Sequence, residues 1–204
     1  MARRRNRVPA SERVFPQFEY TIESLDMEGR GIARGEDGKV VFVEGGLPFE
    51  RVRADVIREK SSYNQARVVQ VLEASPDRVK PKCAAFGVCG GCAMQHMDAR
   101  AQVAAKQRVL EDNLKRIGRV TPDTILRPIA GPTWGYRYRA RLSVRNVHKK
   151  GTVLVGFREK NGSYVAAMEA CEVLPKHISN LLLPLRELVA QTSLIEKIPQ
   201  IEVA

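Results

Sequence analysis

The sequence predicts a mixed, mainly β protein with a β-rich start, one clear helix in the middle and a second β-rich region near its end. Three patterns support this prediction. Apolar residues alternate with polar ones over residues 17–74, a helical repeat follows Asp98, and the alternation returns from Tyr136. A repeat of two places side chains on opposite faces of a strand, whereas a repeat of about 3.6 places them along one side of a helix.

Residues 17–74 contain short predicted strands separated by turns. The first strand alternates Phe18, Tyr20 and Ile22 with polar residues, and the turn Glu36–Gly38 leads into an apolar run. Further strands are expected at residues 39–43, 52–56 and 66–72. Because no helical repeat interrupts them, the region is expected to form a small OB-like antiparallel β-barrel.

One amphipathic helix is predicted between the two β-rich regions. Asp98 is a suitable N-cap, and Gly118 marks the expected end. Four apolar residues share one side of this helix: Val103, Leu110, Leu114 and Ile117. The opposite side is polar, so the apolar side is expected to pack against another part of the protein.

From Tyr136 onward the sequence predicts an antiparallel β-meander with a helix. The three strands and the helix are expected, in this order, near residues 136–145, 152–157, 164–168 and 175–190. Pro184 is expected to kink or cap the helix. Residues 198–204 look like the opening of another strand, so we expect the chain to be the N-terminal part of a longer protein.

Composition divides the chain into four parts. They are a basic arm, the barrel, a region with a linker, a cysteine loop and the helix, and the start of a second β domain: residues 1–16, 17–74, 75–133 and 134–204. The net charge of +11 is uneven, because the barrel carries eleven acidic and eight basic groups. The basic excess elsewhere suits a polyanion such as RNA. A basic protein that its charge merely keeps soluble is the alternative.

The sequence also bears on the compartment. No apolar run approaches the roughly 20 residues that span a bilayer, so no membrane partner is expected. The arginines at the start have no apolar segment after them, which excludes a secretory signal. A mitochondrial transit peptide is an alternative, although Pro9 and Pro16 interrupt any amphipathic helix. A cytoplasmic, reducing compartment is the expectation.

Four cysteines form the most specific pattern. Cys83, Cys89 and Cys92 lie close together in a glycine-rich loop, and Cys171 follows far along the chain. Four thiolates can hold an iron–sulfur cluster, and glycines let the backbone fold closely around it. Structural zinc is the alternative, although zinc sites usually pair two Cys-x2-Cys knuckles and this chain has one. A disulfide framework is not expected in a reducing compartment. His96 is expected to be a surface or helix N-terminal histidine, because four thiolates complete a site.

Four arginines alternate along the strand predicted at residues 136–145. They occupy one face at spacings of about 6–7 Å: Arg137, Arg139, Arg141 and Arg145. Residues 134–160 hold eight basic groups and one acidic group. Guanidinium groups bind phosphates through two hydrogen bonds and stack on bases, so this face is predicted to contact RNA. A solvated face, or arginines paired with acids elsewhere in the fold, is the alternative.

With these residues in view, the chain resembles the bacterial 23S rRNA (uracil-5-)-methyltransferases that carry a TRAM domain and a [4Fe–4S] cluster. The resemblance extends over essentially the whole chain. The segments that carry it are residues 25–34, 38–43, 60–68, 75–83, 86–96 and 134–143.

The resemblance implies a set of site residues. The cluster ligands of the family map onto Cys83, Cys89, Cys92 and Cys171. The TRAM domain is expected to bind RNA through shape and a few groups, because the barrel is acidic overall: Lys60, Tyr63 and Arg67. TRAM domains often read Leu-Pro-Gly-Glu where this chain has Phe49 in the third position, a departure that affects only a turn.

The resemblance also implies methyl transfer from S-adenosylmethionine to C5 of a uridine in ribosomal RNA. A cysteine thiolate adds to C6, and a carboxylate later removes the C5 proton. All four cysteines are assigned to the cluster, and no strand with a Gly-rich cofactor loop appears. A catalytic domain that binds S-adenosylmethionine is therefore expected after residue 204, which leaves this chain inactive alone. A monomer that binds RNA and not DNA is expected. The alternatives are a stand-alone iron–sulfur RNA-binding module and a zinc-stabilised nucleic-acid-binding protein.

Overall fold

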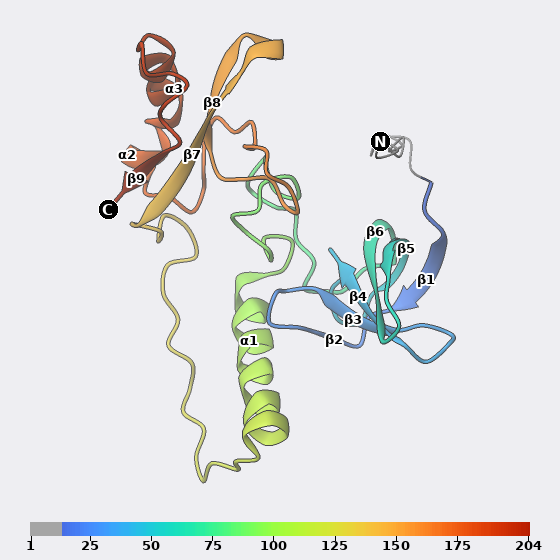
Figure 1. Ribbon diagram of the computed structural model, residues 1–204. Helices are drawn as coiled ribbons and strands as arrows, with labels where there is room; N and C mark the ends of the chain where they lie inside the picture. The colour runs from blue at the N-terminus through green and yellow to red at the C-terminus, as the bar shows by residue number, and fades with distance from the viewer. Residues whose placement is uncertain (1–13) are drawn as a thin grey trace. The chain divides into compact units, whose positions relative to one another are not determined.

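The fold consists of two β-sheets and few helices, as the computed structural model shows for residues 14–204 (Figure 1). Residues 1–13, most of the predicted basic arm, lie outside the described residues. One compact unit ends at Arg78, and a second spans Val79–Ala204. The predicted mixed, mainly β fold is confirmed.

The first unit is a six-stranded sheet. Its strands are β1 (Gln17–Thr21), β2 (Ser24–Leu25), β3 (Gly31–Arg34), β4 (Val40–Glu44), β5 (Arg51–Glu59) and β6 (Tyr63–Glu73). They follow the spatial order β1-β5-β6-β4-β3-β2. All neighbours are antiparallel except β4 and β6, so the prediction of a purely antiparallel barrel is wrong for this pair. The chain reverses direction twice between these strands, and β6 therefore lies beside β4 in the same orientation.

One bent segment closes this sheet into a barrel. Its first half, β1, pairs with β5, and its second half, β2, pairs with β3 at the other end of the strand order. Main-chain hydrogen bonds of Ile22 and Glu23 continue both pairings through the bend. The enclosed core has the alternation that the sequence predicts: Tyr20, Ile22, Ala33, Val41, Val43, Val52, Ala54, Val56 and Ala66.

The second unit contains a three-stranded antiparallel sheet. Its strands are β7 (Ala140–Val147), β8 (Thr152–Gly156) and β9 (Gln200–Val203), in the order β8-β7-β9. The prediction that residues 164–168 form the third strand is wrong: they pair with the chain after β8 only at an isolated bridge between Arg158 and Val165, and the third strand is β9, on the other side of β7. Main-chain groups of Arg158 and Lys160 pair instead with the cysteine loop. The segment after β8 therefore folds over that loop rather than along the sheet.

The helices follow the predicted positions with local differences. They are α1 (Ala99–Asn113), a π-helical turn η2 (Leu114–Gly118), a 3₁₀ turn η3 (His148–Lys150), α2 (Lys176–Ser179) and α3 (Leu182–Ala190). Asp98 caps α1 as predicted, since its side chain accepts a hydrogen bond of 2.9 Å from the Arg100 amide. The helix expected over residues 175–190 is broken before Leu182, so Pro184 lies in the first turn of α3, where its missing N–H costs no hydrogen bond.

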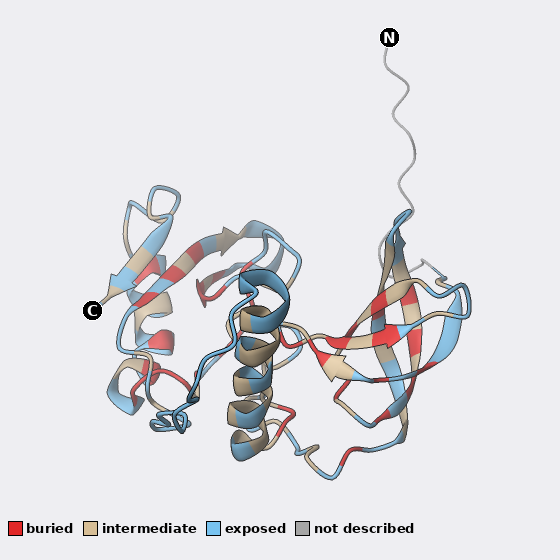
Figure 2. Cartoon of the chain, turned by 90° about the horizontal axis from the view of Figure 1, so that it is seen from below, coloured by how far each residue is buried: buried red, intermediate tan, exposed pale blue. Residues whose placement is uncertain are grey.

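The helices differ in how far they are buried. The core of the second unit includes Leu182 and Val189 of α3, whereas α1 has no buried residue (Figure 2). Within residues 14–204, none of the helices combines the length and the apolar character that a membrane crossing requires.

Candidate functional site

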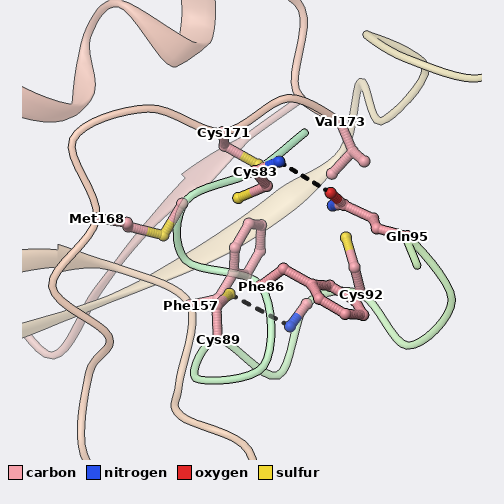
Figure 3. A pocket seen from close by; sticks show the side chains of 10 residues that line it. Cys83, Phe86, Cys89, Cys92, Gln95, Phe157, Met168, Cys171 and Val173 are labelled. Atoms are coloured by element: carbon pink, nitrogen blue, oxygen red, sulfur yellow. Dashed lines mark hydrogen bonds between the residues drawn. The ribbon is translucent and has the colours of Figure 1, made fainter. Parts of the chain in front are cut away.

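The four cysteines lie around one cavity in the second unit. Cys83, Cys89, Cys92 and Cys171 all line it, and Figure 3 shows their sulfur atoms facing the same space. None of them forms a disulfide. The remaining lining residues are mostly apolar: Phe86, Gly91, Gln95, Phe157, Met168 and Val173. The fold thus brings together four thiols that are separated by up to 88 positions in the sequence.

The cysteine loop is held by its own turns and by the segment after β8. The Phe86 amide donates to the Cys83 carbonyl at 3.1 Å, and Gly87 has a φ of 88°, which a glycine adopts without strain. The Gly90 amide donates to the Arg158 carbonyl at 2.9 Å. A Cβ at Gly90 would lie 3.2 Å from that carbonyl oxygen, so the close approach favours glycine.

Cys171 reaches the cavity from the other side. Its amide donates to the hydroxyl of Ser179, a buried residue of α2, at 2.8 Å. The next residues bind the chain that leads into β7, because the Gly135 amide donates to the Glu172 carbonyl and the Arg137 amide to the Val173 carbonyl. No sequence pattern predicts the Ser179 contact, because it depends on the short helix α2 lying against Cys171.

Burial dominates the electrostatics of the two most enclosed thiols. Burial raises the pKa of Cys89, and the hydrogen bond from the Gly91 amide to its Sγ (3.4 Å) opposes this only in part. Burial likewise raises the pKa of Cys171 against the amides of Leu174 and Val173. Without a cation between them, these groups therefore favour the neutral thiol.

The chemistry of the four thiols limits which metal group they could hold. Four thiolates around zinc each lie about 2.3 Å from the ion. Among residues 14–204, no group of three or more histidine, cysteine, aspartate or glutamate side chains is arranged to hold a single metal ion. The four thiols border one mostly apolar cavity. An all-thiol donor set of this kind fits an iron–sulfur cluster and also fits structural zinc.

His96 is buried, so the expectation of a surface histidine is wrong. Its side chain is 4% exposed, and its ring lies 5.4 Å from that of Phe86, measured between centroids. His96 is not among the residues that line the cavity. Its position behind Phe86 supports the loop from within.

The four arginines of the predicted face have different surroundings. The guanidinium of Arg137 lies 4.7 Å from the centroid of the Phe157 ring, a residue that lines the cavity. Arg141 is exposed and pairs with Glu202 of β9 at 2.9 Å. Arg139 and Arg145 are exposed. The apolar face of β7 is buried as predicted at Ala140, Leu142 and Val144, whereas Tyr136 and Tyr138 precede the strand and are exposed.

The three barrel residues expected to bind RNA lie near one another in sequence but differ in setting. Lys60 is exposed in the turn between β5 and β6, where its amide donates to the Tyr63 carbonyl at 2.9 Å. The Tyr63 ring stands edge-on to Phe42, with centroids 5.5 Å apart. Arg67 is exposed and lies 3.6 Å from Glu44. Two of these residues belong to β6, and Lys60 belongs to the turn that leads into it.

A buried ion pair, which the sequence did not reveal, fixes the end of the barrel. Glu50 is fully buried and accepts hydrogen bonds from the amides of Leu47 and Ser75 and from the guanidinium of Arg78, at 2.7 Å between Nη2 and Oε2. Arg78 also donates to the Gly45 carbonyl. Burial raises the pKa of Glu50, but these hydrogen bonds outweigh it and lower the pKa overall.

Comparison with known proteins identifies the barrel. Residues 14–69 match the TRAM domain family. The first unit is a TRAM domain. Its six strands, including the parallel pair β4 and β6, form the barrel of this TRAM domain.

Relatives extend the similarity beyond the TRAM domain. The 23S rRNA (uracil(1939)-C(5))-methyltransferase RlmD of Burkholderia lata is 58% identical over 208 residues, which cover 100% of this chain and 44% of the relative. The protein of the same name from Bordetella avium is 63% identical over 90% of this chain and 38% of the relative. The predicted resemblance is confirmed, and the chain spans less than half the length of these relatives.

A solved structure shares the fold. It is the crystal structure of Pyrococcus abyssi tRNA (uracil-54, C5)-methyltransferase in complex with S-adenosyl-L-homocysteine, with a TM-score of 0.54 and 24% sequence identity. The match covers 84% of this chain and 36% of that chain. At this identity the likeness concerns the arrangement of the elements.

Proposed function

We propose that this chain is the RNA-recognition and iron–sulfur part of an enzyme that methylates C5 of a uridine in 23S rRNA with S-adenosylmethionine. The similarity to the Burkholderia and Bordetella methyltransferases over 90–100% of the chain carries this proposal. The TRAM domain and the basic second unit support the RNA partner. The enzyme would act as a cytoplasmic monomer on RNA, not on DNA.

The cofactor of this part would be a [4Fe–4S] cluster held by Cys83, Cys89, Cys92 and Cys171. The convergence of four thiols on one cavity supports a metal group at this place, and the presence of only one Cys-x2-Cys pair favours a cluster over zinc. When bound, the cluster would supply four iron–thiolate bonds. These bonds would tie the loop of residues 83–92 to the segment that contains Cys171.

RNA would be bound by groups from both units. In the second unit, Arg139 and Arg145 are exposed, and Arg141 can exchange Glu202 for a phosphate. In the TRAM domain, Lys60, Tyr63 and Arg67 would contribute a smaller set of contacts. The target uridine must leave its base stack before its C5 can be reached.

The reacting groups would lie outside this chain. The reaction needs a cysteine nucleophile, and all four cysteines of the chain line the cavity. The nucleophile and the site for S-adenosylmethionine would belong to the rest of the enzyme, since the relatives are more than twice as long. The chain by itself would therefore bind RNA without methylating it.

The test uses the full-length protein purified without oxygen. Iron, sulfide and zinc are quantified, and methyl transfer from labelled S-adenosylmethionine to 23S rRNA is mapped by mass spectrometry. We expect iron and sulfide in a [4Fe–4S] ratio and a methyl group on C5 of one uridine. Stoichiometric zinc without iron would refute the cluster, and unmodified RNA with an intact cluster would favour a non-catalytic RNA-binding module.

A further inference from the structure

Six aliphatic side chains are exposed along one short stretch of the second unit. The stretch, residues 110–129, comprises the end of α1, η2 and the chain after it, and we name it the aliphatic segment. Its exposed side chains have exposed fractions from 46% to 102%: Leu110, Ile117, Val120, Ile125, Leu126 and Ile129. Single exposed aliphatic residues are common on protein surfaces, but a concentration of them marks a site that another surface covers.

The main chain of this region also lacks partners within the described part of the protein. No hydrogen bond between main-chain groups joins residues 121–134 to another residue of the range 14–204. Loops of more than about 12–15 residues without secondary structure are uncommon in compact domains. Figure 1 shows the segment leaving the end of α1 as extended chain that returns to β7. A second surface would supply the missing contacts.

Helix α1, whose end belongs to the aliphatic segment, also has few contacts with the rest of the structure. It has no buried residue, and among the described elements its extensive contacts are with η2 alone. The sequence predicts that its apolar side packs against something, yet Leu110 is 54% exposed and Ile117 is 78% exposed. An amphipathic helix is stabilised mainly by burying its apolar side. The described residues provide that burial only in part, since Val103 and Leu114 are half-buried while Leu110 and Ile117 are exposed.

We propose that the aliphatic segment is the docking surface for the remaining part of the full-length methyltransferase. This inference rests on the proposed function. The relatives place the aligned region within proteins more than twice as long, so more than half of their length has no counterpart in this chain. A catalytic domain of that size would cover α1 and the extended chain after it.

The charge of the segment favours a protein surface over RNA. Residues 110–129 contain four basic and three acidic groups and no aromatic residue. Residues 134–160, by contrast, contain eight basic groups and one acidic group. RNA attracts a basic and aromatic surface, whereas a nearly neutral aliphatic surface suits an apolar protein face.

Hydrogen–deuterium exchange of the full-length protein tests the docking. Without RNA, we expect amides of residues 121–134 to exchange about tenfold or more slowly than in an unstructured peptide of the same sequence. The protection should not depend on protein concentration. Free exchange overturns the proposal, as does protection that appears only with 23S rRNA or only as the protein dimerises.

A paired substitution locates the contact. In the full-length protein, Leu126→Asp with Ile129→Asp should speed exchange at residues 121–134 and at peptides beyond residue 204. Val14→Asp is the control, because Val14 is an aliphatic residue that is 97% exposed in the other unit. If the double variant does not fold, a photoreactive residue in place of Ile129 should still crosslink to peptides beyond residue 204. Crosslinks to RNA alone would contradict the docking.

The same samples separate this inference from the proposed function. Methyl transfer to 23S rRNA is measured beside the exchange. Slow amide exchange at residues 121–134 without methyl transfer would refute the proposed function and leave the docking supported. Methyl transfer with free amide exchange at residues 121–134 would refute the docking and leave the proposed function supported.

Discussion

Phe49 holds a left-handed backbone conformation, with a φ of 70°, while its side chain is 78% exposed. L-residues pay about 1–2 kcal/mol for this conformation, and glycine avoids that cost. TRAM domains often have glycine at this position, which the resemblance indicated without giving the reason. The turn places Glu50 next to Arg78, so the strained residue supports the buried pair.

We expect Phe49→Gly to raise the free energy of unfolding by up to about 1 kcal/mol, because relief of the left-handed strain exceeds the added flexibility of the unfolded chain. Urea denaturation measures the change. Phe18→Gly is the matched control, since Phe18 is 47% exposed in strand β1 and glycine should destabilise a strand. A loss of stability in Phe49→Gly would show that the phenyl ring outweighs the strain.

Glu50 makes the stability of the TRAM domain depend on pH. Its folded-state pKa is lowered, so the carboxylate stabilises the fold above its unfolded pKa of about 4.3. This contribution is lost as the pH falls through the folded-state pKa. Glu50→Gln should cost about 3 kcal/mol at pH 7, because Arg78 loses its charged partner, and the difference from wild type should shrink below about pH 4. Urea denaturation between pH 3 and 7 measures this, and a difference that is constant across that range would contradict the assignment.

At the scale of elements, β7 combines a buried apolar face with an exposed basic one. Its apolar residues fill the core of the second unit, and the four arginines of the strand and of the chain before it differ in their partners. Arg137 lies against Phe157, and Arg141 pairs with Glu202 across the sheet. Equal spacing in sequence therefore does not make the four arginines equally available to RNA.

We expect Arg139→Ala with Arg145→Ala to weaken RNA binding by the full-length protein. Each lost phosphate contact should reduce the slope of log affinity against log salt by about 0.7, or about 1.4 for the pair. Filter binding at several salt concentrations measures the slope. Arg51→Ala with Arg53→Ala is the control, because both arginines are exposed but pair with Glu19. An unchanged slope in the variant of Arg139 and Arg145 would remove these residues from the RNA site.

For the molecule as a whole, the cavity of the cysteines connects three separate stretches of the second unit. The loop of residues 83–92, the segment after β8 and the segment around Cys171 meet there. The Glu172 and Val173 carbonyls in turn hold the chain that leads into β7. A group bound by the four thiols would therefore stabilise the loop of residues 83–92 and also the chain that leads into β7.

We expect Cys171→Ser in the full-length protein to lower iron and sulfide content and the melting temperature of the second unit, because metal binding contributes to folding free energy. Absorbance of the cluster and calorimetry measure the two effects. Val88→Ser, at an exposed position in the same loop, should keep both near wild type. Full iron content in Cys171→Ser would show that Cys171 is not a ligand.

Several elements were predictable because their signals are local. The alternation of Val52, Ala54 and Val56 defines a buried strand face, and Asp98 marks the start of α1. The strand predicted at residues 164–168 is reduced to an isolated bridge with Arg158, in a stretch of chain that also pairs with the cysteine loop. Such competition between distant partners leaves no trace in a local repeat.

The sequence by itself determined the β-rich architecture, the central helix and the four thiols, because side-chain periodicity and residue chemistry are properties of short segments. Only the tertiary structure decided that the thiols share one cavity, that Arg137 turns to Phe157 and that Glu50 is buried against Arg78. It also showed that the apolar side of α1, which the sequence expected to be packed, has no fully buried residue. These features depend on contacts between segments that are far apart in the sequence. Such contacts form only in the folded chain.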